Sequence, residues 1–208
     1  TIYSWIHRGF LAVTEKVLRR KGKKPGTQER RGRFNVKKTI KDRPQEVENR
    51  ETFGHWELDT MVSSRGQSKG CLATFVERKT RFYIAIKMDD RSKDSMFLAI
   101  SSLYNTLTSK LLKTFTVDRG KEFACFEQVE TEFGIPMYFA DAYAAWQRGS
   151  NENSNGLLRE FFPKKTDLAK VTLDKLTEAL MLINNRPRKC LGFKTPFDMF
   201  KHVIRKLI

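Results

Sequence analysis

The order of apolar patterns after Gly54 is the feature that most limits how this chain can fold. Strand-like runs occur at 56–62, 71–78, 81–88, 114–117 and 137–140. Helical spacing of apolar residues occurs at 92–109, 123–133, 151–162 and 173–184, and a short helix is predicted after Pro196. Short turns join the first three strands, which predicts an antiparallel meander, whereas the later strands alternate with helices as parallel strands do.

This order predicts an α/β fold of the RNase H type, a mixed sheet in which three antiparallel strands are extended by parallel strands and flanked by helices. The chain has 208 residues, of which 39% are hydrophobic and 16 are Phe, so it contains enough apolar material for a packed core. We expect that core at 54–208. An N-terminal amphipathic helix at 1–18 and a basic linker arm at 19–53 are expected before it.

The net charge of +16 is concentrated in the arm. Residues 19–43 include twelve basic and two acidic side chains with few apolar ones, so this stretch should become ordered only on a partner. Lys and Arg release counterions when they bind phosphates, which favours nucleic acid as the partner over a merely solvated linker. The arm residues expected to contact DNA are Arg19, Arg20, Lys23, Lys24, Arg30, Arg31 and Arg33.

Other classes of protein are disfavoured by the sequence. No apolar run approaches the roughly 20 residues needed to span a bilayer, and no secretory signal is evident, so we expect a soluble, cytoplasmic protein. The three cysteines, Cys71, Cys125 and Cys190, are far apart and lack CxxC spacing, which supports neither a disulfide framework nor a zinc site. Because the first residue is Thr1 rather than Met, we expect a fragment of a longer protein.

Three acidic residues stand where acids are unusual unless they bind a cation. Asp59 lies inside a predicted strand, Asp118 follows the carboxyl end of another, and Glu152 lies in the first turn of a predicted helix. If the strands are neighbours and the helix packs across them, the three carboxylates converge. The ordinary alternatives are a turn residue before a glycine for Asp118 and a partner of the helix dipole for Glu152.

A cluster of three carboxylates needs divalent metal, because like charges at close range raise one another's pKa. Oxygen ligands select Mg²⁺ or Mn²⁺ over zinc, and two ions about 3.5–4 Å apart would support in-line displacement at a phosphodiester. The expected chemistry is therefore cleavage or transfer of a nucleic-acid strand. Arg159, two helical turns after Glu152, would project toward the same phosphate, unless it is an ordinary surface arginine.

Five segments of the chain carry a family resemblance that covers about residues 40–200: RPQEVENRETFGHWELDT, VERKTRFY, VDRGKEF, YFADAYAAWQRGSNENSNGLLREFFPKKTDL and NNRPRKCLGFKTPFDMF. They resemble the catalytic region of bacterial transposases of the insertion-sequence-thirty family, within the DDE transposases and retroviral integrases. It implies an RNase H-like fold, metal-binding acids at Asp59, Asp118 and Glu152, and a basic partner at Arg159. It also implies an upstream DNA-reading region, double-stranded DNA as partner, homo-oligomers on that DNA, and a location at the bacterial nucleoid.

The chain departs from the family pattern at three positions. Leu58 replaces the glycine of the common sequence GHWEGD, and Ala142 and Ala145 replace prolines around the tyrosine of the loop before the predicted glutamate helix. A loop without those prolines should be less rigid. The predicted catalytic acids are unaffected.

Two further groups of residues are expected to contact DNA. The group before the glutamate helix is Trp146, Gln147 and Arg148, with a core position for the tryptophan as the alternative. The group after the helix predicted at 173–184 is Arg186, Arg188 and Lys189, where cations would also cap the helix end.

The sequence thus predicts a Mg²⁺-dependent enzyme that cuts and joins DNA at the ends of an insertion sequence. The alternative is a DNA-binding fragment or repressor without catalysis, because the basic arm alone would explain binding. A nuclease acting on RNA hybrids would usually have a glutamate in the first helix after the meander, and 92–109 contains only Asp94. We expect neither a membrane partner nor a small-molecule substrate.

Overall fold

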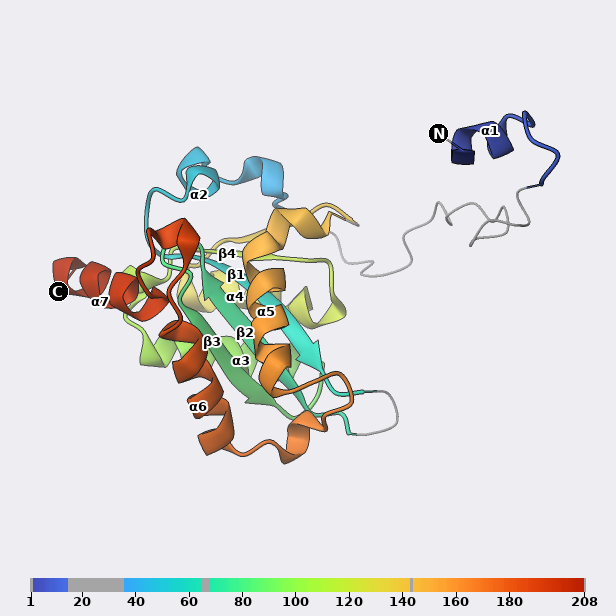
Figure 1. Cartoon of the computed structure of the whole chain (residues 1–208). Helices are drawn as coiled ribbons and strands as arrows, with labels where there is room; N and C mark the ends of the chain where they lie inside the picture. Colours follow the sequence, from blue (N-terminus) through green and yellow to red (C-terminus); the bar gives the residue numbers. More distant parts are fainter. Residues whose placement is uncertain (1, 15–35, 65–67, 143, 208) are drawn as a thin grey trace. The chain divides into compact units, whose positions relative to one another are not determined.

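The computed structural model describes residues 2–14, 36–64, 68–142 and 144–207 (Figure 1). The chain divides into two compact units, Thr1–Arg30 and Arg31–Ile208. Among the helices formed by the described residues, none is both long and apolar enough to cross a membrane.

In the first unit, helix α1 spans Ile2–His7, so the predicted helix at 1–18 is much shorter than expected. Gly9 ends it with a left-handed φ of 71°, a conformation that favours glycine. The N–H of Gly9 donates to the carbonyl of Ile6 at 3.1 Å, and the N–H of Phe10 donates to the carbonyl of Trp5. These two hydrogen bonds close the last turn of the helix. The prediction of one long helix is therefore wrong for residues 8–14, and residues 15–18 lie outside the described ranges.

The second unit is built on a mixed sheet with the strand order β3-β2-β1-β4-β5. Its strands are β1 (His55–Val62), β2 (Cys71–Glu77), β3 (Tyr83–Met88), β4 (Thr114–Val117) and β5 (Met137–Phe139). The first three pair in antiparallel fashion, whereas β4 runs parallel to both β1 and β5. The predicted α/β fold, with an antiparallel meander extended by parallel strands, is confirmed.

Helices cover both faces of this sheet (Figure 1). They are α3 (Lys93–Thr106), α4 (Phe126–Phe133), α5 (Gly149–Phe161), α6 (Leu173–Asn184) and α7 (Pro196–Leu207). The predicted start of α3 is confirmed by Ser92, whose hydroxyl accepts a hydrogen bond from the Ser95 N–H at 3.1 Å. The helix predicted at 123–133 is shorter, because Lys121–Cys125 forms a 3-10 helix before α4.

Alternation of side chains along β1 decides which residues meet which helices. Leu58 belongs to a buried cluster that includes residues of α3, α4 and α7. Met61 belongs to the other cluster, which includes Leu158 of α5. Glu57 and Asp59 alternate in step with Met61, so they lie on the face of the sheet that α5 covers.

Part of the predicted basic arm is folded against the sheet. Residues 36–53 include the short helix α2 (Gln45–Asn49), within which Val47 is fully buried. Arg43 is buried too, and its guanidinium donates to Thr116 Oγ1 at 3.1 Å and pairs with Glu48. The expectation that residues 19–43 become ordered only on a partner was therefore wrong for 36–43, because these residues find partners in the core.

His55, at the start of β1, makes the stability of the fold depend on pH. Its ring is buried, and its two nitrogens each lie 2.8 Å from a threonine hydroxyl, Thr52 or Thr114. Burial lowers the pKa of His55 from 6.5 to about 4. The neutral ring therefore stabilises the folded state fully above pH 6.5, and this contribution is lost as the pH falls through about 4.

We expect the difference in unfolding free energy between the wild type and His55→Gln to shrink by roughly 2–3 kcal/mol between pH 7 and pH 4, because a tenfold change in proton affinity corresponds to about 1.4 kcal/mol. Urea denaturation at a series of pH values measures it. The variant removes the titrating group but can still form a hydrogen bond. A difference that stays constant with pH would contradict this role of His55.

Candidate active site

Asp59 and Asp118 come together because the strands that carry them are parallel neighbours. The register pairs Glu57 of β1 with Thr116 of β4, so each aspartate lies two residues beyond the same pair. Asp59 is still within β1, and Asp118 directly follows the end of β4. This is the strand arrangement that the sequence-based expectation required.

The guanidinium of Arg148 joins the two carboxylates. Its Nη1 lies 3.5 Å from Asp59 Oδ1, and its Nη2 lies 3.1 Å from Asp118 Oδ2. Nη1 also donates to the carbonyl of Leu58 at 3.0 Å, and the Arg148 side chain is only 13% exposed. A positive charge is therefore held between two of the acids that were predicted to share metal ions.

Hydrogen bonds from neighbouring side chains, together with the charge of Arg148, orient the Asp59 carboxylate. Burial raises its pKa, and the nearby guanidinium of Arg148 acts in the opposite direction. Asn155 Nδ2, on α5, donates to Asp59 Oδ2 at 3.0 Å, and the hydroxyl of buried Tyr83 donates to Asn155 Oδ1 at 2.6 Å. Sequence reasoning missed both Asn155 and Tyr83, because nothing in the local pattern links them to an acid on another strand.

Glu152 lies outside this pair of aspartates. It occupies the first turn of α5, three residues before Asn155 and so on a neighbouring part of the same helix surface, and its side chain is exposed. Within the described ranges, no three His, Cys, Asp or Glu side chains are close enough to hold a metal ion together. The structure thus brings together two of the three predicted acids, and the expected convergence of all three side chains is not formed in it.

A buried ion pair lies beneath the first turn of α5 and is hydrogen-bonded to it. Glu57 is fully buried and pairs with Arg78, whose side chain is 4% exposed. Glu57 Oε2 accepts a hydrogen bond from the N–H of Asn151 at 2.9 Å, and the Glu57 carbonyl accepts one from Asn151 Nδ2 at 3.0 Å. The first turn of α5 is thereby tied to the strand that carries Asp59. Alternation along β1 was the signal that could have identified Glu57, which stands two residues before that aspartate.

A second buried acid, Glu122, is bonded to Thr60, the residue after Asp59. Its Oε1 accepts hydrogen bonds from Thr60 Oγ1 at 3.0 Å and from Arg91 Nε at 2.6 Å. A Cβ at Gly120 would lie 2.5 Å from Glu122 Oε2, so a larger residue at this position would displace the Glu122 carboxylate from its partners. The positive charge of Arg91 interacts with both aspartates. The ion pair of Arg91 and Glu122 therefore contributes to the electrostatic environment of the site.

Residues of the loop before α5 were predicted to contact DNA. Trp146 is 77% exposed, which excludes the alternative that it belongs to the core. Gln147 closes the loop by accepting a hydrogen bond from the Asp141 N–H at 2.8 Å and donating to Asp141 Oδ2 at 3.0 Å. Of this group, the tryptophan is therefore the most accessible to a ligand.

The other basic residues that were predicted to contact DNA bond to groups of the protein, are exposed, or lie outside the described residues. Arg159 donates to the carbonyl of Val62 at 2.9 Å, so its head group ties α5 to the end of β1. Arg186 pairs with Glu160 at 3.1 Å, and Arg188 donates to a carbonyl of α6 at 3.2 Å. Lys189 is exposed. The predicted arm contacts Arg19, Arg20, Lys23, Lys24, Arg30, Arg31 and Arg33 lie outside the described residues.

Comparison with known proteins identifies the class to which this fold belongs. Residues 49–145, a range that contains Asp59 and Asp118, match the integrase core domain family. The structure is similar to the catalytic core domain of BIV integrase, with a TM-score of 0.58 and 18% identity, covering 74% of this chain and 98% of the other. The fold is therefore that of an integrase catalytic core, which is RNase H-like.

Proteins of similar sequence identify the family, within this class, to which the chain belongs. Transposase InsI of insertion sequence element IS30A from Escherichia coli (strain K12) is 39% identical over 184 residues, which is 88% of this chain and 47% of the relative. The transposase of IS4351 from Bacteroides fragilis is 36% identical over 215 residues, which is 99% of this chain and 64% of the relative. The chain belongs to the IS30-type transposases, as its motifs indicated, and spans about half the length of the E. coli relative.

Proposed function

We propose that this chain carries the catalytic core of a transposase that cuts and joins DNA strands at the ends of an insertion sequence. The observation that supports this most directly is the pair of Asp59 and Asp118, which two parallel strands hold on either side of the Arg148 guanidinium. Two carboxylates so close repel each other unless a cation lies between them. The transposase names of its relatives support double-stranded DNA as the substrate.

The donors of this site fit Mg²⁺ or Mn²⁺. Asp59 and Asp118 offer only oxygen atoms, and the pair already holds a positive charge, so a divalent ion can take the place of Arg148. Glu152 is the proposed third ligand, from the part of α5 next to Asn155. When bound, two such ions would activate the attacking oxygen and stabilise the leaving oxygen of a phosphodiester.

Arg148 has two roles in this proposal. Paired with the aspartates, it neutralises them in the free protein. Released from them, its guanidinium can donate two parallel hydrogen bonds to a DNA phosphate. Asn155, held by Tyr83, keeps the Asp59 carboxylate oriented in both situations, and exposed Trp146 offers a flat apolar surface to the DNA.

DNA binding without catalysis is the second candidate function. It is favoured by the net charge of +16 and by the arginine that already occupies the acid pair. Under either function, a homo-oligomer on DNA and a cytoplasmic, nucleoid-associated location stay predictions.

The assay that separates the two functions uses duplex DNA taken from the sequences that flank the gene, where imperfect inverted repeats are expected. We expect the wild-type chain to bind this duplex with or without metal, and to produce nicked and joined strands only with Mg²⁺ or Mn²⁺. Gel analysis of labelled strands measures the products. Binding with no product at any metal concentration would support the second function and refute the first.

A further inference from the structure

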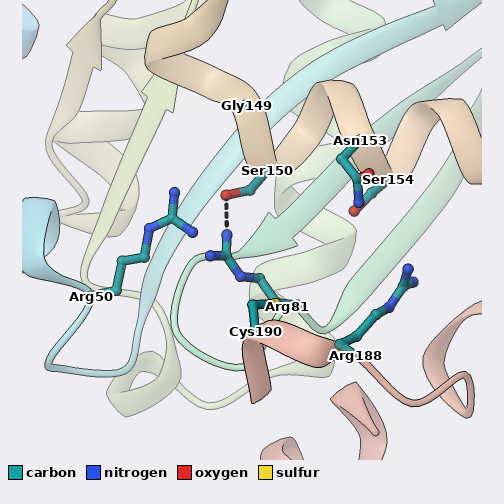
Figure 2. A pocket seen from close by; sticks show the side chains of 8 residues that line it. All are labelled: Arg50, Arg81, Gly149, Ser150, Asn153, Ser154, Arg188 and Cys190. Atoms are coloured by element: carbon teal, nitrogen blue, oxygen red, sulfur yellow. Dashed lines mark hydrogen bonds between the residues drawn. The ribbon is translucent and has the colours of Figure 1, made fainter. Parts of the chain in front are cut away.

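A pocket of about 270 Å³ lies at the amino-terminal end of α5 (Figure 2). Arginines from three separate parts of the chain line it: Arg50 follows α2, Arg81 precedes β3, and Arg188 precedes the 3-10 helix Lys189–Leu191. None of the side chains that line the pocket, all of which belong to the described residues, is acidic. The pocket therefore gathers three positive charges that are far apart in sequence.

The guanidinium groups of these three arginines have no ion-pair partner within the part of the chain that the structure describes. Arg81 donates to the hydroxyl of Ser150, toward which its head group points in Figure 2. The Nε of Arg188 is buried and has no hydrogen-bond partner among the described residues. The Arg188 guanidinium is thus only partly satisfied by the protein.

Charges gathered in this way cost free energy unless an anion neutralises them. Burial lowers the pKa of Arg81 and that of Arg188, which reflects incomplete solvation of their charged forms. The amino-terminal end of α5, a helix of 13 residues, adds partial positive charge beside Ser150 and Asn153. A phosphate group suits these features, because planar guanidinium groups donate paired hydrogen bonds to its oxygens.

The position of the pocket indicates the source of that phosphate. Gly149 lines the pocket, and the residue before it, Arg148, holds the aspartate pair. The cationic lining favours a charged backbone over a base or an apolar ligand. We propose that the pocket binds a backbone phosphodiester of the DNA substrate, separate from the phosphate that reacts at Asp59 and Asp118. This inference rests on the proposed function, since it takes DNA as the substrate.

Salt dependence of DNA binding tests the proposal. We expect the double variant Arg50→Gln/Arg188→Gln to bind labelled duplex at least 5-fold more weakly than the wild type in EDTA. We also expect the plot of log K against log salt concentration to become less steep by about one to two units, because phosphate contacts are lost. Fluorescence anisotropy at several salt concentrations measures both. The matched control is Lys201→Gln/Arg205→Gln, which removes the same charge from the exposed side of α7. Equal losses in the two double variants would overturn the proposal.

A second variant separates binding from folding. Arg50 has a left-handed φ of 58°, so Arg50→Gly removes the guanidinium while relieving the backbone. We expect Arg50→Gly to weaken DNA binding about as much as Arg50→Gln, with an unchanged or higher melting temperature. Wild-type affinity in a folded Arg50→Gly variant would count against a phosphate contact by this residue.

Cys190 provides a direct probe of occupancy. It lines the pocket and is exposed, whereas Cys71 and Cys125, the other two cysteines of the chain, are buried. We expect saturating duplex to slow alkylation of Cys190 by iodoacetamide at least 5-fold, and inorganic phosphate at the same phosphate concentration to have little effect. Mass spectrometry of the native protein measures the rate. Protection by inorganic phosphate alone would assign the pocket to free phosphate and overturn the DNA proposal.

These outcomes are distinguishable from failure of the proposed function. If the wild-type chain cuts DNA while the pocket variants bind like their control, the pocket proposal fails alone. If the wild-type chain binds duplex and Cys190 is protected but no strand is cut, the pocket proposal is supported and catalysis fails. If the wild-type chain binds no DNA, both fail.

Discussion

Replacing Asp59 by Asn is expected to lower metal-dependent strand cleavage by at least about 10³-fold, equivalent to about 4 kcal/mol of transition-state stabilisation. The substitution keeps the shape of the side chain and removes the negative charge that would hold a divalent ion. It also leaves Asp118 as the acid that Arg148 still binds, so the loop before α5 should stay in place. Initial rates of product formation on the flanking-DNA duplex with Mg²⁺ measure the effect.

Matched variants show whether the loss is specific to the site. Asp174→Asn removes a carboxylate from the exposed first turn of α6 and should leave the cleavage rate within about 2-fold, because surface substitutions rarely matter. DNA binding by Asp59→Asn in EDTA should equal or exceed that of the wild type, since a negative charge near the phosphates is lost. Undiminished cleavage by Asp59→Asn would remove the proposed catalytic role of the aspartate pair.

Replacing Glu57 by Ala is expected to lower the free energy of unfolding by about 3–5 kcal/mol. The substitution leaves the buried Arg78 guanidinium with only Glu48, at 3.9 Å, as an ion-pair partner, and removes the carboxylate that accepts from the Asn151 N–H. Because that N–H lies in the first turn of α5, the beginning of the helix should loosen as well. Urea denaturation measures the stability, and hydrogen exchange of the α5 amides measures the loosening.

Two comparisons identify the buried charge as the cause. Glu160→Ala breaks the exposed ion pair with Arg186 and should cost less than about 1 kcal/mol. The double variant Glu57→Met/Arg78→Met removes both buried charges and should recover part of the stability lost by Glu57→Ala alone. A double variant less stable than Glu57→Ala, or equal costs for Glu57→Ala and Glu160→Ala, would contradict this explanation.

Local patterns predicted most of the elements of this fold. The strand at 114–117 and the helix at 173–184 have the predicted bounds, and Ser92 caps α3 as expected, because periodicity and capping depend on residues close in sequence. The long helix at 1–18 failed at Gly9, where a left-handed glycine outweighed the apolar spacing that continues beyond it.

The site was predicted less completely. A carboxylate inside a strand and another at a strand end were recognisable as unusual, and their strands are neighbours as expected. The partners of these acids were not recognisable. Arg148 meets Asp59 from 89 residues away in sequence and Asp118 from 30, and it was expected to contact DNA rather than the acids.

The sequence by itself therefore determined most of the segments that form strands and helices, how they alternate, and which family the motifs indicate. Only the tertiary structure decided that Arg148 lies between the two aspartates, that Glu152 does not form a metal-binding group with them among the described residues, and that buried Glu57 binds the first turn of α5. The physical reason is that periodicity is a property of neighbouring residues. The partner of a buried charge is chosen by packing, which brings together side chains from any part of the chain.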